Sequence, residues 1–258
     1  MSSIPKMSSF PTVIETVGWR WEQLAAPDRE LDGFWIGVDA DGNKWLTKLR
    51  GSFYAYREIV FAKLAQTMGW SCQSSVFIRI DVDSAEKLGV QAFEVHAAHW
   101  FMNEHCPSAC GPRCPFVPII NGVRCNLEYI SKSQIKYMMD WPKSVIASYV
   151  FGGSEPPDRF FTSDHEFVII DSEQMFATGP VCFDSDRWLV NDDESPSVLG
   201  RDIALQVCRA VSALSRKNIS LALDVPASVY IDMLWPIEPL INSSIEFAEI
   251  YVHAKLSD

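Results

Sequence analysis

The stretch DGNKWLTKLRGSFYAYREIVFAKLAQTMGW (residues 41–70) carries the signals that decide the fold. Its first part, NKWLTKL (43–49), is rich in aromatic and apolar residues and predicts a strand, as does GFWIGVD (33–39) before it. The turn residues Ala40-Asp41-Gly42 separate the two, so together they predict a hairpin. Residues 55–69 then place apolar side chains at helical spacing and end in a glycine, which predicts a helix.

The remaining elements fall into two unlike halves. VFIRIDV (76–82) alternates and predicts a strand, and EFVIID (166–171) predicts a short buried one. Helices are expected mainly in the second half of the chain, over residues 126–151, 199–217, 224–234 and 243–256. A Gly/Pro/Asp-rich loop (152–164) precedes the strand predicted over 166–171. This order predicts an α+β fold rather than a regular βαβ alternation.

Composition limits the classes of function. The chain has 258 residues, 48% of them hydrophobic, enough to build a full core. Its net charge is −11 and it has no run of Lys or Arg, which disfavours a nucleic-acid partner. No window of 18 apolar residues is present and the first residues do not form a signal peptide, so we expect a cytoplasmic protein without membrane spans. In that compartment the seven cysteines are expected to be reduced, as core residues or metal ligands.

Four ionisable residues stand in the order that phosphoryl transfer requires. Lys48 lies in a predicted strand and Glu58 in the following helix, where a carboxylate makes a buried lysine tolerable. Asp158 lies in the loop FGGSEPPDRFF (151–161), and Asp171 ends the next strand, where ligands and metals collect. The alternative is that Lys48 and Glu58 lie on solvated faces, and that the two aspartates only cap a turn and a strand exit.

The same segments resemble the HipA-like kinases. In that family a strand lysine precedes a helix of the form E-x(5)-LA-x-x-(L/M)-G, which Glu58, Leu64-Ala65, Met68 and Gly69 match. PDRFFTSDHEFVIIDSEQMF (157–176) is similar to the family's catalytic loop and metal strand. The tail around DVPASVYIDML (224–234) is similar to its C-terminal helices. The resemblance spans roughly residues 33–82 and 145–258.

The resemblance implies a bilobal protein-kinase-like fold and a role for each matching residue. Lys48 would bind the α- and β-phosphates of ATP, and Glu58 would pair with Lys48. Asp158 would be the catalytic base, with Arg159 supporting the loop or the acceptor. Asp171 would bind Mg²⁺.

The chain departs from the family at the second metal ligand. Where the family usually has asparagine, five residues after the catalytic aspartate, this chain has Ser163. The Ser163 hydroxyl or the Asp164 carboxylate would have to serve as the oxygen ligand of Mg²⁺ instead. No glycine-rich phosphate loop is present. Arg50-Gly51-Ser52, just after Lys48, is the nearest candidate for a turn that covers the phosphates. The resemblance implies that Ser52 is a candidate autophosphorylation site; the alternative is a simple turn residue.

The Cys/His-rich segment 96–125 is predicted to be an irregular insertion. Three of its cysteines follow a C-x3-C-x3-C spacing, and zinc prefers four nitrogen or sulfur ligands. The predicted ligands of a structural zinc ion are Cys106, Cys110 and Cys114, with His99, His105 or Cys125 as the fourth. The alternative is three cysteines on a surface loop without a metal.

These observations predict two lobes. Residues 1–125 would form a small strand-rich N-lobe that includes the insertion, and residues 126–258 a helical C-lobe with the catalytic loop at 152–171. The expected function is an ATP- and Mg²⁺-dependent kinase acting on Ser or Thr of a protein, with a regulatory partner as in bacterial toxin–antitoxin kinases. The alternatives are a pseudokinase or zinc-stapled interaction module, and a metal-dependent hydrolase built on Asp158, Asp164 and His165.

Overall fold

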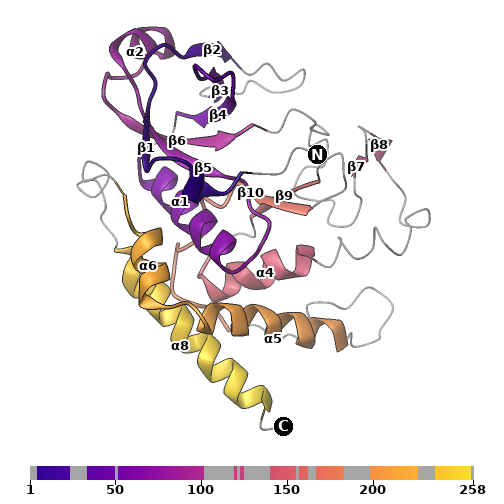
Figure 1. Cartoon of the computed structure of the whole chain (residues 1–258). Helices are drawn as coiled ribbons and strands as arrows, with labels where there is room; N and C mark the ends of the chain where they lie inside the picture. Colours follow the sequence, from indigo (N-terminus) through magenta and orange to yellow (C-terminus); the bar gives the residue numbers. More distant parts are fainter. Residues whose placement is uncertain are drawn as a thin grey trace.

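A computed structural model shows a sheet half and a helical half that meet at one buried helix (Figure 1). The residues that it describes are 5–23, 34–49, 52–101, 119–120, 123–124, 140–154, 157–161, 167–182, 198–225 and 236–256. The α+β class expected from the sequence is confirmed, with a strand-rich first half and a mainly helical second half.

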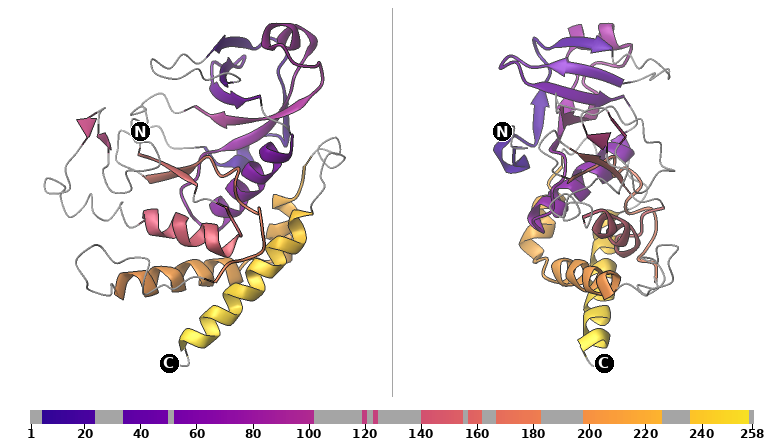
Figure 2. Two further views of the ribbon diagram at one scale, coloured as in Figure 1. Left: turned by 180° about the vertical axis from the view of Figure 1, so that it is seen from behind. Right: turned by 90° about the vertical axis from the view of Figure 1, so that its right-hand side faces the viewer.

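Helix α1 (Ser52–Thr67) is the buried helix. Every side chain from Ala55 to Ala62 is buried, because the sheet covers one side of the helix and the helical half the other (Figures 1 and 2). The helix gives way to Gly69, whose φ of +77° is a conformation that glycine adopts without strain. The helix predicted over 55–69 is confirmed and starts three residues earlier.

The main sheet has six strands in the order β1-β5-β6-β4-β3-β2. Pairing is antiparallel except between β1 and β5. The strands are β1 (Val13–Glu15), β2 (Arg20–Gln23), β3 (Phe34–Val38), β4 (Lys44–Lys48), β5 (Ser75–Arg79) and β6 (Val95–Trp100).

The predicted hairpin is β3–β4. The Asp39 carboxylate holds its turn, accepting hydrogen bonds from the backbone N–H groups of Asp41 and Asn43, the Asn43 amide and the Trp45 indole, all at 2.9–3.0 Å. Gly42, at φ +81°, completes the turn. Local hydrogen bonding therefore sets the register that brings Lys48 to the end of β4.

The two faces of the sheet bury different cores. One face carries an aromatic cluster with Trp19, Trp21 and Trp45, covered by α2 (Val82–Leu88). The other face, with Phe77 and Ala97, packs on α1. Side chains alternate along a strand, so three polar residues of adjacent strands also lie on the α1 face: Lys48 of β4, His99 of β6 and Ser75 of β5.

The helical half packs against the far side of α1. It comprises α4 (Asp140–Val150), α5 (Val198–Ser212), α6 (Arg216–Ala222) and α8 (Ile237–Leu256). Phe61 of α1 meets Phe151 and Phe176 with ring centroids 5.8 and 6.5 Å apart. The core around α1 is thus shared by both halves.

A two-stranded ladder carries the predicted catalytic segment. Strand β9 (Asp158–Phe161) pairs antiparallel with β10 (Phe167–Ile170). Backbone hydrogen bonds of 2.9 Å join Ile169 to Ser71 and Gln73, which follow α1. They fix the end of β10, and with it Asp171, relative to α1. The other small elements are the 3-10 helix η1 (Met7–Ser9) and the strands β7 (Ile119–Ile120) and β8 (Val123–Arg124).

Several local expectations are corrected. Residues 96–100 are not part of an irregular insertion but most of β6, an inner strand of the sheet. The strand predicted over 76–82 ends at Arg79, because Asp81 caps α2. Residues 158–161 form a strand rather than a loop. The helix predicted over 199–217 is two helices, since Ser215 caps α6.

Other segments differ in extent. The last helix begins at Ile237, earlier than the predicted residue 243. Most of the helix predicted over 224–234, and residues 126–139 of another, lie outside the described residues. Among the described helices, none combines the length and apolar character needed to cross a bilayer.

Candidate functional site

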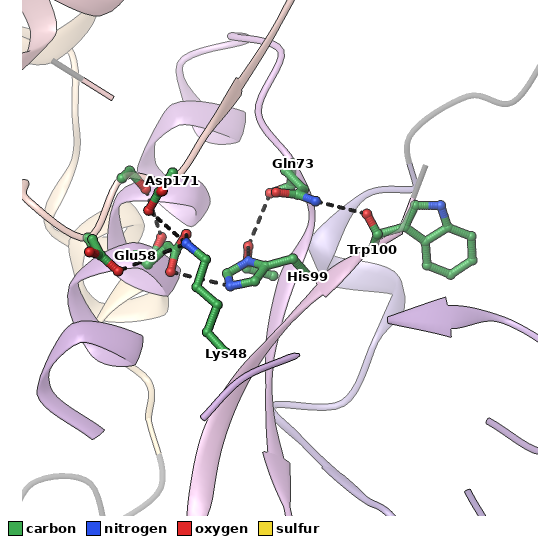
Figure 3. Close-up of polar contacts among 9 residues, drawn as sticks. Lys48, Glu58, Gln73, His99, Trp100 and Asp171 are labelled. Atoms are coloured by element: carbon green, nitrogen blue, oxygen red, sulfur yellow. Dashed lines mark hydrogen bonds and ion pairs between the residues drawn. The ribbon is translucent and has the colours of Figure 1, made fainter. Parts of the chain in front are cut away.

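The side chain of Lys48 joins the sheet to α1 and to the end of β10 (Figure 3). Its Nζ lies 2.9 Å from Glu58 Oε1 and 2.7 Å from Asp171 Oδ1. A third carboxylate oxygen, Glu173 Oε2, lies 4.0 Å away. Only 7% of the Lys48 side chain is exposed. Three acidic groups therefore surround one buried ammonium group.

The carboxylates keep Lys48 charged despite its burial. Desolvation alone lowers the pKa of a lysine, because it disfavours the charged form. Attraction to Glu58 and Asp171, with a hydrogen bond to each, outweighs this and raises the pKa of Lys48 above its ordinary value. Lys48 is thus a permanent cation, held in place from two sides.

Glu58 is the buried partner in this cluster. Its side chain is 4% exposed, and burial alone would raise its pKa. The charges and hydrogen bonds of His99 and Lys48 instead lower the pKa of Glu58 to about 2. Each carboxylate oxygen has a separate neighbour: Oε1 faces Lys48, and Oε2 lies 3.3 Å from His99 Nε2. Glu58 is therefore ionised and fixed at both oxygens.

Asp171 lies on the accessible side of the cluster. Its side chain is 38% exposed, against 4% for Glu58 and 11% for Glu173. Its backbone has φ +49°, in the left-handed region that aspartate tolerates better than most residues. Such strained positions cluster at functional sites, since the surrounding structure must hold them. Here the neighbouring Ser172 hydroxyl donates to the backbone carbonyl of Glu58 at 3.5 Å.

The acidic residues have the chemistry of a Mg²⁺ site. Glu58, Asp171 and Glu173 each offer a carboxylate oxygen, and these oxygens lie within 4.8 Å of one another. Mg²⁺ takes oxygen ligands and is commonly bound through one or two carboxylates together with substrate phosphates. Asp171 and Glu173 fit this requirement best, because Glu58 is engaged by Lys48 and His99.

The structure places the backbone of the predicted catalytic aspartate beside this cluster. Asp158, at the start of β9, pairs directly with Ile170, the residue before Asp171. The side chains of Asp158 and Arg159 lie outside the described part, as does that of Ser52, the first residue of α1. Ser163 and Asp164, the predicted additional metal ligands, and His165 lie outside the described residues, so their roles stay predictions.

The predicted zinc ligands also fall outside the described residues: Cys106, Cys110, Cys114, His105 and Cys125. His99, a further candidate for the fourth ligand, lies in β6 with its two ring nitrogens beside Ser75 and Glu58. It is therefore not available to a zinc ion held by the cysteines. Of the cysteines expected in the core, Cys72 and Cys208 are buried, but Cys182 is exposed and that expectation is wrong.

Comparisons with known proteins yield a distant likeness in structure but no match in sequence. No protein-family model and no curated protein sequence matches the chain. Among solved structures, the chain is similar to the proinflammatory kinase CtkA of Helicobacter pylori. The TM-score is 0.46 at 9% sequence identity, and the alignment covers 92% of this chain and 97% of that one. What this chain does has to be inferred from its own side chains.

Two residues of the cluster, Glu173 and His99, are not predicted to belong to it from the sequence. Glu173 stands two positions after Asp171, and the D-S-E spacing was the signal available for it. His99 was assigned to the insertion because it is close to cysteines along the chain. The alternation of VHAAHW (95–100) was too weak to predict a strand at the centre of a sheet.

Proposed function

We propose that the chain binds Mg²⁺-ATP at this cluster and transfers a phosphoryl group to a Ser or Thr hydroxyl of a protein. The observation that carries the proposal is the grouping of one permanent cation with two acidic groups, at a place where Asp171 reaches solvent. A metal-bound polyphosphate presents the complementary set of charges, phosphate oxygens for Lys48 and a divalent cation for the carboxylates. Without that ligand Lys48 is paired with Asp171 instead.

Each residue has a role that follows from its position. Lys48, held from behind by Glu58, would contact the phosphates when Asp171 releases it. Asp171 and Glu173 would hold Mg²⁺, which when bound neutralises the charge of the transferring group. Asp158, next to this site along β9, would orient the acceptor hydroxyl and receive its proton. Ser52, Arg159, Ser163 and Asp164 keep the supporting roles that the HipA-like resemblance implies.

A second candidate is a nucleotide-binding module without transfer. The 2.7 Å bond from Lys48 to Asp171 must break before either group can take its ligand. Ser163 replaces the asparagine that the resemblance leads one to expect. Binding without phosphoryl transfer would identify this case.

Ligand binding and transfer are measured separately. Binding to the folded state raises the melting temperature, so Mg²⁺-ATP should stabilise the protein more than Mg²⁺ alone. Labelled γ-phosphate is then followed into the chain itself or a generic protein acceptor. We expect Asp171→Asn to abolish binding, and Asp158→Asn to abolish transfer while leaving binding intact. Asp83→Asn, an exposed position on α2, is the matched control.

The outcomes separate the alternatives. No stabilisation by Mg²⁺-ATP at millimolar concentration means that the cluster is a structural ion-pair network, and the proposal fails. If Mg²⁺-ATP stabilises the wild type but not Asp171→Asn, and the wild type transfers no phosphate, the protein is a nucleotide-binding module. Metal analysis of the purified protein tests the separate zinc proposal, which requires close to one equivalent of zinc.

A further inference from the structure

His99 is a buried polar residue in the middle of the sheet. It lies on β6, between Ser75 of β5 and Leu46 of β4 in the strand register. Its side chain is 1% exposed. The two ring nitrogens face different neighbours: Nδ1 forms a hydrogen bond with the Ser75 hydroxyl, and Nε2 lies at ion-pair distance from Glu58 without an aligned hydrogen bond (Figure 3).

The hydrogen atoms can be assigned from these partners. Nδ1 lies 2.7 Å from Ser75 Oγ, and Nε2 lies 3.3 Å from Glu58 Oε2. Glu58 is ionised and can only accept, so the hydrogen must reside on Nε2. Nδ1 accepts from the Ser75 hydroxyl when the ring is neutral and donates to it when the ring is charged. Glu58, which can only accept, thereby determines that a ring hydrogen lies on Nε2, where it faces the glutamate that pairs with Lys48.

We infer that His99 is a positioning residue that holds the Glu58 carboxylate so that Lys48 stays aimed at the phosphate site. This inference rests on the proposed nucleotide function. The ion pair between Lys48 and Glu58 is one contact, about which the carboxylate could turn. With His99 on its second oxygen, Glu58 is fixed between β4 and β6. Glu58 can then retain Lys48 when Asp171 leaves it for a metal ion.

The charges of the cluster explain why the contact between His99 and Glu58 affects the position of Lys48. Lys48 has carboxylates on both sides, so if Glu58 turned away the ammonium group would follow Asp171 and Glu173. A phosphate arriving there would meet a lysine already neutralised by the metal-binding acids. The His99–Glu58 contact prevents this arrangement by keeping the opposing carboxylate in place.

Kinetics test the positioning role in the full-length protein. His99→Gln keeps an N–H donor near the place of Nε2, whereas His99→Ala removes it. We expect His99→Ala to raise KM for ATP and to lower kcat/KM by roughly 10- to 100-fold, as loss of a supporting contact does at metal sites. His99→Gln should recover most of this. A merely structural role would lower the fraction of active protein and leave KM for ATP unchanged, which would overturn the inference.

A second mutation shows whether His99 acts through Glu58. In a Glu58→Gln background the added change His99→Ala should have little further effect on KM for ATP, because the two residues form one unit. Additive losses would overturn the inference.

The contact itself is tested without any nucleotide. Nitrogen-15 NMR of the histidine-labelled wild type should show a hydrogen on His99 Nε2, and Glu58→Gln should shift that resonance. A hydrogen found on Nδ1 alone would overturn the inference. If the contact is present but the wild type binds no Mg²⁺-ATP, the proposed function fails, and the positioning role fails with it.

Discussion

At the scale of single residues, Lys48 and Glu58 form a buried ion pair, which stabilises the fold only when both residues are present. Each is costly to desolvate, and the pair offsets that cost only while both members are present. Asp171 adds a partner that reaches solvent. Lys48 and Glu58 are therefore held in the interior, whereas Asp171 can exchange Lys48 for another partner.

Removing one member of the pair should destabilise the protein strongly. Lys48→Met leaves the Glu58 carboxylate buried without the ammonium group that pairs with it, and we expect the free energy of unfolding to fall by about 3 kcal/mol. Lys48→Met combined with Glu58→Gln should recover at least half of the loss, since neither member of the pair is then left as a lone buried charge. Urea unfolding measures both. Equal stability of the single and double variants would show that Glu58 is already solvated.

The same pair predicts how stability depends on pH. The folded-state pKa of Glu58, about 2, is below the ordinary value of 4.5, so its contribution is complete above pH 4.5 and is lost as pH falls toward 2. A shift of this size corresponds to about 3 kcal/mol. Glu58→Gln should flatten the acid limb of the curve of unfolding free energy against pH. An unchanged acid limb would assign that limb to other carboxylates.

At the scale of elements, the site depends on how the segment after β10 is held against α4. Gly152, just beyond the end of α4, has φ +61°, and its Cα faces the backbone carbonyls of Thr178 and Gly179. The Thr178 N–H in turn donates to the Gly152 carbonyl at 2.9 Å. This close backbone approach fixes the far end of the segment that carries Asp171 and Glu173.

A methyl group at residue 152 should therefore disturb both folding and the site. Gly152→Ala places a Cβ against the Thr178 carbonyl, and backbone cannot move aside as a flexible side chain can. We expect a fall in melting temperature larger than that of Gly89→Ala. Gly89 has a similar φ of +71° but open space around it, so its substitution isolates the conformational cost, about 1 kcal/mol. Differential scanning calorimetry compares the two variants, and equal shifts would contradict the packing described.

At the scale of the whole molecule, α1 makes one core out of two halves. Phe61 is fully buried and touches aromatic rings of the helical half, while Glu58 on the same helix is bound to two strands of the sheet. Five of the nine tryptophans belong to the cluster on the sheet's other face, so much of the fluorescence reports on the sheet half: Trp19, Trp21, Trp35, Trp45 and Trp100. Far-UV circular dichroism reports mainly on the helices.

The sheet half and the helical half should unfold in one transition, so the fluorescence and the circular dichroism should change together. We expect Phe61→Ala to lower the unfolding free energy by about 3–5 kcal/mol and to move the fluorescence and dichroism transitions by the same amount. Ile250→Ala, at a position 64% exposed on α8, should change neither appreciably. Separate transitions in the Phe61 variant would show that the halves are independent folding units.

Local features of this fold can be predicted from the order of its residues. The β3–β4 hairpin, helix α1 and the strand ending at Asp171 follow from residue spacing and turn chemistry that act within a few positions. The order of Lys48, Glu58 and Asp171 along the chain also allowed their association to be predicted. Only the tertiary structure decided that β6 lies inside the sheet, and that His99 and Glu173 join the cluster. Strand order and burial arise from contacts between distant segments, and the charge state of a buried group depends on neighbours that no local pattern specifies.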